Sequence, residues 1–140
     1  MKVYKANRKG FINYLVIGSV LLPIAIFFLD KNTFTEKPFI LLPLLSPLVL
    51  IFWIYFDTFY KIENKELMYR SGFIRGKIEI SNINEIVKGK TKWSGIKPAL
   101  ARKGLIIKFN KYDEVYIAPK NNEELISDLM KLNPEIKITE

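Results

Sequence analysis

The side chains that most often carry chemistry at neutral pH are missing from this sequence. It contains no histidine and no cysteine, so the commonest general base, the usual zinc ligands and any thiol nucleophile are absent. No phosphate-binding loop of the form G-x-x-x-x-G-K-[ST] and no G-x-S-x-G nucleophile motif occurs. The closely spaced carboxylates fall at predicted turns and at a predicted helix start, as the pairs Glu63 and Glu66, Asp113 and Glu114, and Glu123 and Glu124. We therefore expect no catalytic residue, no metal site and no cofactor, and a protein that is not an enzyme.

Residues 88–103 have a composition suited to binding. This segment contains six basic side chains and no acidic one, spaced around the apolar residues Trp93, Ile96 and Leu100. It could lie on an anionic membrane surface, where each basic residue contributes up to about 1 kcal/mol. It could equally be a solvated loop whose Trp93 and Leu100 cover one end of a barrel. The candidate residues for contact with a membrane or a partner are Lys88, Lys90, Lys92, Trp93, Lys97, Arg102 and Lys103.

Two apolar runs upstream determine where such a segment can act. Residues 11–29 and 38–56 each count 19 residues without a charged side chain, and the eight residues of loop 30–37 separate them. A helix of that length spans about 28 Å, close to the hydrocarbon thickness of a bilayer. Only a helix satisfies its own backbone groups in lipid, so residues 11–57 are predicted to form two transmembrane helices. The alternative, a helical hairpin buried in a soluble protein, needs an apolar shell that the polar remainder of the chain does not supply.

The basic residues lie mainly on both flanks of this hairpin. The chain has 22 Lys and Arg against 14 Asp and Glu, yet Lys31 and Lys37 are the only basic residues in loop 30–37. Under the positive-inside rule both termini face the cytoplasm and the loop faces outward, which predicts a multi-pass protein of the cell membrane. Residues 1–10 are then a basic, mobile lead-in on the cytosolic side. No predicted helix carries a basic stripe, so the expected partner is the lipid bilayer and not nucleic acid.

Residues 58–140 change to alternating apolar and polar positions, which is typical of short antiparallel strands. Asn121 followed by Glu124 predicts the start of an amphipathic helix that Pro134 ends. The expected fold is an α+β cytosolic domain, an antiparallel barrel of six or seven strands closed by this C-terminal helix. The predicted strands lie at 58–62, 67–70, 77–80, 83–87, 104–109 and 114–118.

The order of these elements suggests a pleckstrin-homology (PH)-like domain, and the residues sharpen the likeness. The sequence resembles the small bacterial PH-like (short PH) domain family over roughly residues 59–138. The resemblance implies a PH-like barrel that faces the cytosol and has a non-enzymatic role. The segments that carry it are 60–63, 67–72, 78–80, 98–100, 105–109, 112–120, 123–126 and 133–134.

Two spans before one such domain are similar to the arrangement of a membrane-anchored bacteriocin immunity protein. This likeness implies an immunity or accessory role in which the domain binds a bacteriocin peptide or its membrane target. The alternatives are an anionic-lipid-binding module and a scaffold subunit of an envelope assembly, whose hairpin would contact a transporter through Gly18, Ser19 and Ser46. A phosphoinositide pocket is not expected, because Lys61, Lys65, Arg70 and Arg75 do not form a convincing ligand cluster in the sequence.

Overall fold

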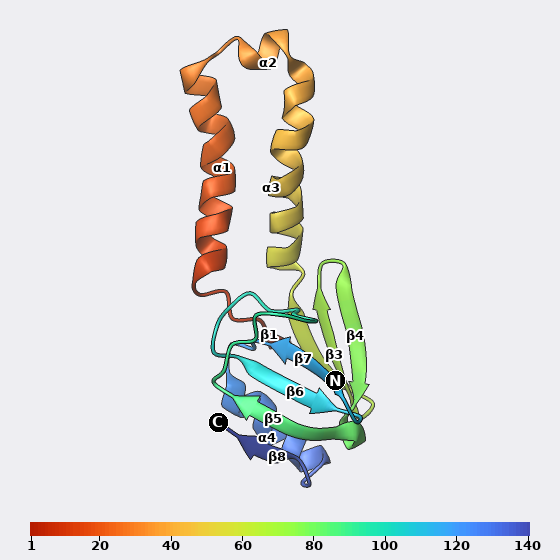
Figure 1. Cartoon of the computed structure of the whole chain (residues 1–140). Coiled ribbons are helices and arrows are strands. Elements are labelled where there is room, and N and C mark those ends of the chain that lie inside the picture. The colour runs from red at the N-terminus through yellow and green to blue at the C-terminus, as the bar shows by residue number, and fades with distance from the viewer.

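The structure, a computed structural model, describes all residues 1–140 and places a long helical hairpin on a compact domain of strands (Figure 1). The helices α1 and α3 run side by side and are joined by the short helix α2 and the 3-10 turn η1. Helix α1 and the η1–α3 segment have the predicted limits, 11–29 and 38–56. The bounds are α1 Phe11–Leu29, α2 Thr33–Glu36, η1 Pro38–Ile40 and α3 Leu41–Phe56.

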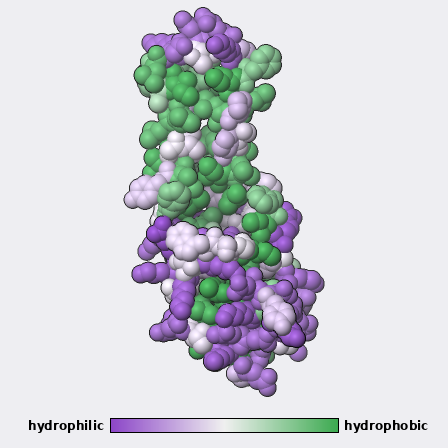
Figure 2. Space-filling view, viewed as in Figure 1, coloured by the Kyte–Doolittle hydropathy of each residue, from purple (hydrophilic) through white to green (hydrophobic).

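Both long segments of the hairpin are long and apolar enough to cross a membrane. Neither contains a buried residue, whereas the core helix of a soluble protein would be mostly covered. Figure 2 shows a hydrophobic column between two hydrophilic ends, the loop that joins the long helices and the domain. A Cβ added to Gly18 would meet no atom within 4 Å, so Gly18 does not bring α1 and α3 into close contact.

The domain consists of two four-stranded sheets rather than the predicted closed barrel. The first sheet is antiparallel in the order β1-β2-β3-β4, and the second has the order β7-β6-β5-β8, with β8 parallel to β5. The predicted count of six or seven strands misses the two short strands at the chain ends. The bounds are β1 Lys2–Lys5, β2 Phe59–Glu63, β3 Glu66–Ser71, β4 Ile74–Glu79, η2 Ile80–Asn82, β5 Ile83–Lys88, β6 Leu105–Phe109, β7 Asp113–Ile117, α4 Asn122–Leu132 and β8 Lys137–Thr139.

Local sequence explains the tight β2–β3 connection. Asn64 and Lys65 both have positive φ, 51° and 61°, between the cross-strand pair Glu63 and Glu66. Two consecutive left-handed residues are typical of a type I′ turn, whose twist matches that of the flanking strands. The turn and its hairpin therefore lie where the sequence predicts them.

Helix α4 covers the core as its apolar periodicity predicts. Its residues Leu125, Ile126 and Leu129 are buried in one cluster of 18 residues that draws side chains from both sheets. The Asn121 side chain accepts a hydrogen bond of 3.2 Å from the Glu124 N–H, which confirms the predicted N-cap. At the other end, the Asn133 side chain donates to the Ile80 carbonyl at 2.9 Å and joins the end of the helix to η2.

The first residues of the chain are part of the domain, contrary to the predicted mobile lead-in at 1–10. Strand β1 pairs with β2 from Lys2 opposite Ile62 to Lys5 opposite Phe59. Tyr4 and Ala6 are buried, and the Asn7 N–H donates to the Ala118 carbonyl just after β7 at 2.8 Å. The hairpin is therefore inserted between two paired strands of one sheet.

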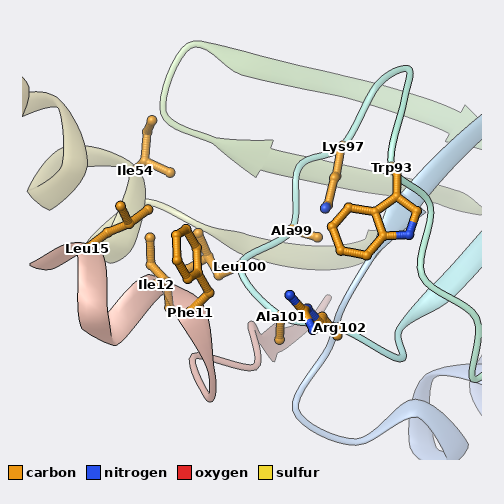
Figure 3. Close-up of a pocket in the computed structure, with 10 residues that line it drawn as sticks. All are labelled: Phe11, Ile12, Leu15, Ile54, Trp93, Lys97, Ala99, Leu100, Ala101 and Arg102. Atoms are coloured by element: carbon orange, nitrogen blue, oxygen red, sulfur yellow. The ribbon is translucent and has the colours of Figure 1, made fainter.

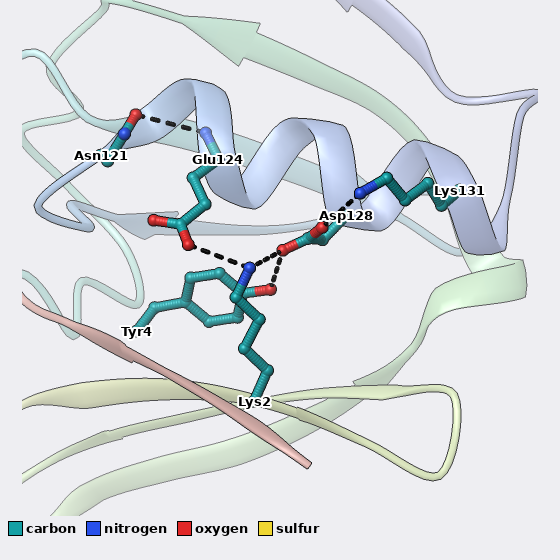
Figure 4. Close-up of polar contacts among 6 residues, drawn as sticks. All are labelled: Lys2, Tyr4, Asn121, Glu124, Asp128 and Lys131. Atoms are coloured by element: carbon teal, nitrogen blue, oxygen red, sulfur yellow. Dashed lines mark hydrogen bonds and ion pairs between the residues drawn. The ribbon is translucent and has the colours of Figure 1, made fainter.

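A polar cluster fixes β1 on α4 (Figure 4). The Asp128 carboxylate accepts hydrogen bonds from Lys2 Nζ at 2.5 Å and from the Tyr4 hydroxyl at 2.6 Å. Lys131 donates to the same carboxylate at 3.0 Å, and Glu124 forms a second ion pair with Lys2 at 2.9 Å. These bonds, that of Lys2 first, hold the pKa of Asp128 well below its usual range, and the partner carboxylates raise the pKa of Lys2.

Replacing Tyr4 with Phe should weaken this attachment. The variant Tyr4→Phe loses one hydrogen bond to a carboxylate, so we expect the free energy of unfolding to fall by about 1 kcal/mol and the β1 amides to exchange faster. The measurements are thermal melting in detergent and amide hydrogen exchange. As a matched control, Tyr112→Phe removes a hydroxyl from a side chain that is 85% exposed, and should change neither.

The pKa shifts of Asp128 and Lys2 determine how the attachment of β1 to α4 depends on pH. A depressed Asp128 pKa means that its contribution is complete above the ordinary Asp value near 4 and is lost as pH falls toward the folded value. A raised Lys2 pKa means that its contribution is complete below the ordinary Lys value near 10 and is lost at higher pH. Protection of β1 should therefore be constant across neutral pH; a loss near pH 6–7 would contradict the cluster.

Candidate functional site

The predicted basic segment forms one irregular loop between β5 and β6, on the side of the domain that carries the hairpin (Figure 1). The Gly89 N–H donates to the Gly104 carbonyl at 3.0 Å and closes the base of this loop. A Cβ at Gly104 would lie 2.1 Å from the Ile117 carbonyl oxygen, so only glycine fits at the closing position. The loop therefore has fixed ends.

Two buried tyrosines hold the far part of the loop against the sheets. The Tyr60 hydroxyl donates to the Pro98 carbonyl at 2.7 Å and accepts from the Ala118 N–H at 3.0 Å. The Tyr116 hydroxyl donates to the Ala101 carbonyl at 2.7 Å and accepts from the Gly104 N–H at 3.0 Å. Burial raises the pKa of Tyr60, which keeps its hydroxyl a neutral donor.

The candidate basic residues do not form a single cluster. Lys88 is paired with Glu123 of α4 and Lys92 with Glu114 of β7, so both are neutralised by carboxylates from distant parts of the chain. The bond to Glu123 raises the pKa of Lys88. Lys90 and Lys103 are exposed and take part in no ion pair, and the cations in cation–π contact with Trp93 are two other residues.

The remaining two cations gather at one aromatic side chain. Lys97 Nζ lies 5.4 Å and the Arg102 guanidinium carbon 5.2 Å from the centre of the Trp93 ring, within the range of cation–π attraction. Trp93 is 74% exposed, whereas Leu100 is buried in the core. Of the alternative in which both residues cover the end of a barrel, the structure therefore shows only the burial of Leu100.

This trio borders a groove of about 260 Å³ between the loop and the base of the hairpin (Figure 3). Eight of its ten lining residues are apolar, and none is acidic. One wall comes from the helices and the other from the loop, so the groove exists only because the hairpin sits on the domain. The lining residues are Phe11, Ile12, Leu15, Ile54, Trp93, Lys97, Ala99, Leu100, Ala101 and Arg102.

Polar contacts fix the hairpin on the domain beside this groove. Arg8 Nε donates to the Tyr55 carbonyl at 2.8 Å, and the Asn13 amide donates to the Arg8 carbonyl at 2.8 Å. On the other helix, Asp57 forms an ion pair with Arg70 at 2.8 Å. These bonds join the start of α1 to the end of α3, and they join the residue after α3 to β3 of the first sheet.

A second basic face lies on the outside of the first sheet. Lys61, Arg70, Arg75 and Lys77 line a shallow cavity of about 400 Å³, while Lys65 lies in the β2–β3 turn outside it. We did not expect Lys61, Arg70 and Arg75 to lie together, but the pairing of β2, β3 and β4 brings them to one cavity. Three of the four basic residues that line this cavity form ion pairs with carboxylates at 2.6 to 2.9 Å, and Arg75 does not. The cavity therefore has little net charge for a ligand. No three acidic side chains converge to hold a metal ion.

Closure of the loop provides a test of the site. Adding a methyl group in Gly104→Ala forces a backbone shift, so we expect a loss of about 1–3 kcal/mol in the free energy of unfolding and faster exchange of the loop amides. The measurement is hydrogen exchange with thermal melting in detergent. Gly18→Ala adds the same methyl group in open space and should be tolerated; equal behaviour of the two variants would contradict the close packing at Gly104.

Comparison with known proteins agrees with this architecture. Residues 58–133 match the family model described as "Bacterial PH domain", a match that begins at β2 and leaves out β1 and the hairpin. A curated relative is the "Uncharacterized protein YyaB" of Bacillus subtilis (strain 168), 32% identical over 101 residues, which cover 71% of this chain and 68% of the relative. No solved structure matches. The chain therefore belongs to the bacterial PH domain family.

Proposed function

We propose that this chain is a non-enzymatic binding module held at the inner face of the cell membrane. In this proposal α1 and α3 cross the bilayer and both termini are cytoplasmic, as the basic flanks of the hairpin favour. The observation that carries it is the direct connection between the hairpin and the domain: α3 ends at Phe56 and β2 begins at Phe59. With so short a connection, anything the domain binds is bound at the membrane surface.

The role we propose is that of a bacteriocin immunity or accessory protein. The groove between hairpin and loop opens where a peptide entering the bilayer, or its membrane target, would meet the domain. Its apolar walls and exposed Trp93 suit an amphipathic partner, since interface anchors are commonly aromatic. Binding to such a partner could protect the cell without any chemical step.

Expression in a sensitive host tests this role. Cells that produce the chain should survive exposure to sublancin, the bacteriocin whose immunity protein the sequence resembles, better than cells with an empty vector. The variant Lys97→Gln/Arg102→Gln should protect less, because both cations border the proposed binding groove. Unchanged killing of cells that insert the chain correctly would overturn the immunity role.

Correct insertion is checked in the same cells. The chain has no cysteine, so in a variant with one introduced cysteine a maleimide can label only that position. A membrane-impermeable maleimide should label Lys31→Cys, in the outer loop, on intact cells and should label Lys111→Cys, in the domain, only after lysis. Labelling of Lys111→Cys from outside would reverse the proposed orientation.

A second candidate function is an anionic-lipid-binding or scaffold module of an envelope assembly. The observation that favours it is the charge of the groove, which has two cations and no acid among its lining residues. For the scaffold role, the observation is that Gly18 has no neighbouring atom within 4 Å of an added Cβ, so this position on α1 is open to a helix of another protein.

A further inference from the structure

We propose that the groove of Figure 3 binds the headgroup of an anionic phospholipid from the inner leaflet. In this assignment Lys97 and Arg102 contact the phosphate, and the acyl chains continue along Phe11 and Leu15 of α1. The inference rests on the proposed placement of the hairpin in the membrane. It adds a defined ligand class to a groove that belongs jointly to the hairpin and the domain.

The apolar wall of the groove is continuous with the lipid-facing surface of the hairpin. Phe11 is 63% and Leu15 41% exposed, and both line the groove from the first turns of α1. Ile12 and Ile54 lie deeper and pack against the core of the domain. An acyl chain next to α1 would therefore have its headgroup at the level of the loop.

The polar end of the groove has the charge that a phosphate group requires. Lys97 and Arg102 take part in none of the ion pairs of the chain, in contrast to the neutralised Lys88 and Lys92. Both cations lie within 5.4 Å of the centre of the Trp93 ring, and both line the groove. A groove lined by two positive charges and no acidic side chain attracts an anion, because a phosphate compensates charges that no carboxylate of the chain neutralises.

The indole ring of Trp93 suits a site at the depth of the lipid headgroups. Indole rings favour the headgroup level of a bilayer, where the ring meets apolar chains and the N–H meets water or phosphate. A lipid satisfies all three features of the groove at once, because it joins an anionic group to an apolar chain and is present at the hairpin surface in excess. A protein partner would have to displace it.

Lipid retention in native mass spectrometry tests the assignment. The full-length chain is reconstituted in nanodiscs of phosphatidylcholine mixed with phosphatidylglycerol and then released into detergent. We expect it to keep phosphatidylglycerol in preference to phosphatidylcholine. In Lys97→Gln/Arg102→Gln this preference should fall about tenfold or more, as expected for the loss of two cations at the leaflet surface.

The matched control is Arg75→Gln/Lys111→Gln. It also removes one Arg and one Lys, both exposed and without a carboxylate partner, but neither lines the groove. It should keep the preference, and unchanged circular dichroism should show that both variants fold. An equal loss in both variants would indicate diffuse surface attraction and overturn the site.

The remaining outcomes separate this inference from the proposed function. Equal retention of both lipids by a chain that enters nanodiscs would overturn the lipid site and leave the groove to a protein partner. A chain that fails to enter nanodiscs at all would overturn the membrane placement itself, and the lipid site with it.

Discussion

The pairing of β1 with β2 is the constraint on which the arrangement of the whole chain depends. The two strands flank the hairpin in the sequence and lie side by side in the sheet, so the start of α1 and the end of α3 are held together at the domain. Loop-closure free energy rises only slowly with length, so a long insertion between paired strands is tolerated. The hairpin is therefore fixed to the domain at both ends rather than tethered by one flexible linker.

This attachment creates the candidate site. Because both helix ends are fixed, residues of α1 and α3 form one wall of a groove whose other wall is the loop between β5 and β6. Tyr60 and Tyr116 hold that loop through its backbone carbonyls, while Gly104 closes its base. The positions of Lys97 and Arg102 thus follow from backbone bonds to the core, and no carboxylate of the chain neutralises their side chains.

Elements with a strong local pattern could be predicted from the sequence. The uncharged runs give the two long helices, and Asn121 with Glu124 gives the start of α4. Strand β1 could not be found in this way, because four residues with two lysines have no distinctive periodicity and their partner strand lies beyond the hairpin. The sequence shows that the loop between β5 and β6 is basic. It does not show that Lys88 and Lys92 pair with carboxylates of α4 and β7, because those pairs depend on tertiary contacts that leave no local pattern.

Disulfide cross-linking between β1 and β2 tests the central claim most directly. Val3 and Lys61 are directly opposite in the strand pair, at a Cα separation typical of a disulfide, and the chain has no other cysteine. In native membranes Val3→Cys/Lys61→Cys should cross-link rapidly under mild oxidation. The pair Val3→Cys/Met68→Cys, one strand farther away, should not. Absence of the first cross-link, or equal rates for both pairs, would contradict the insertion of the hairpin between paired strands.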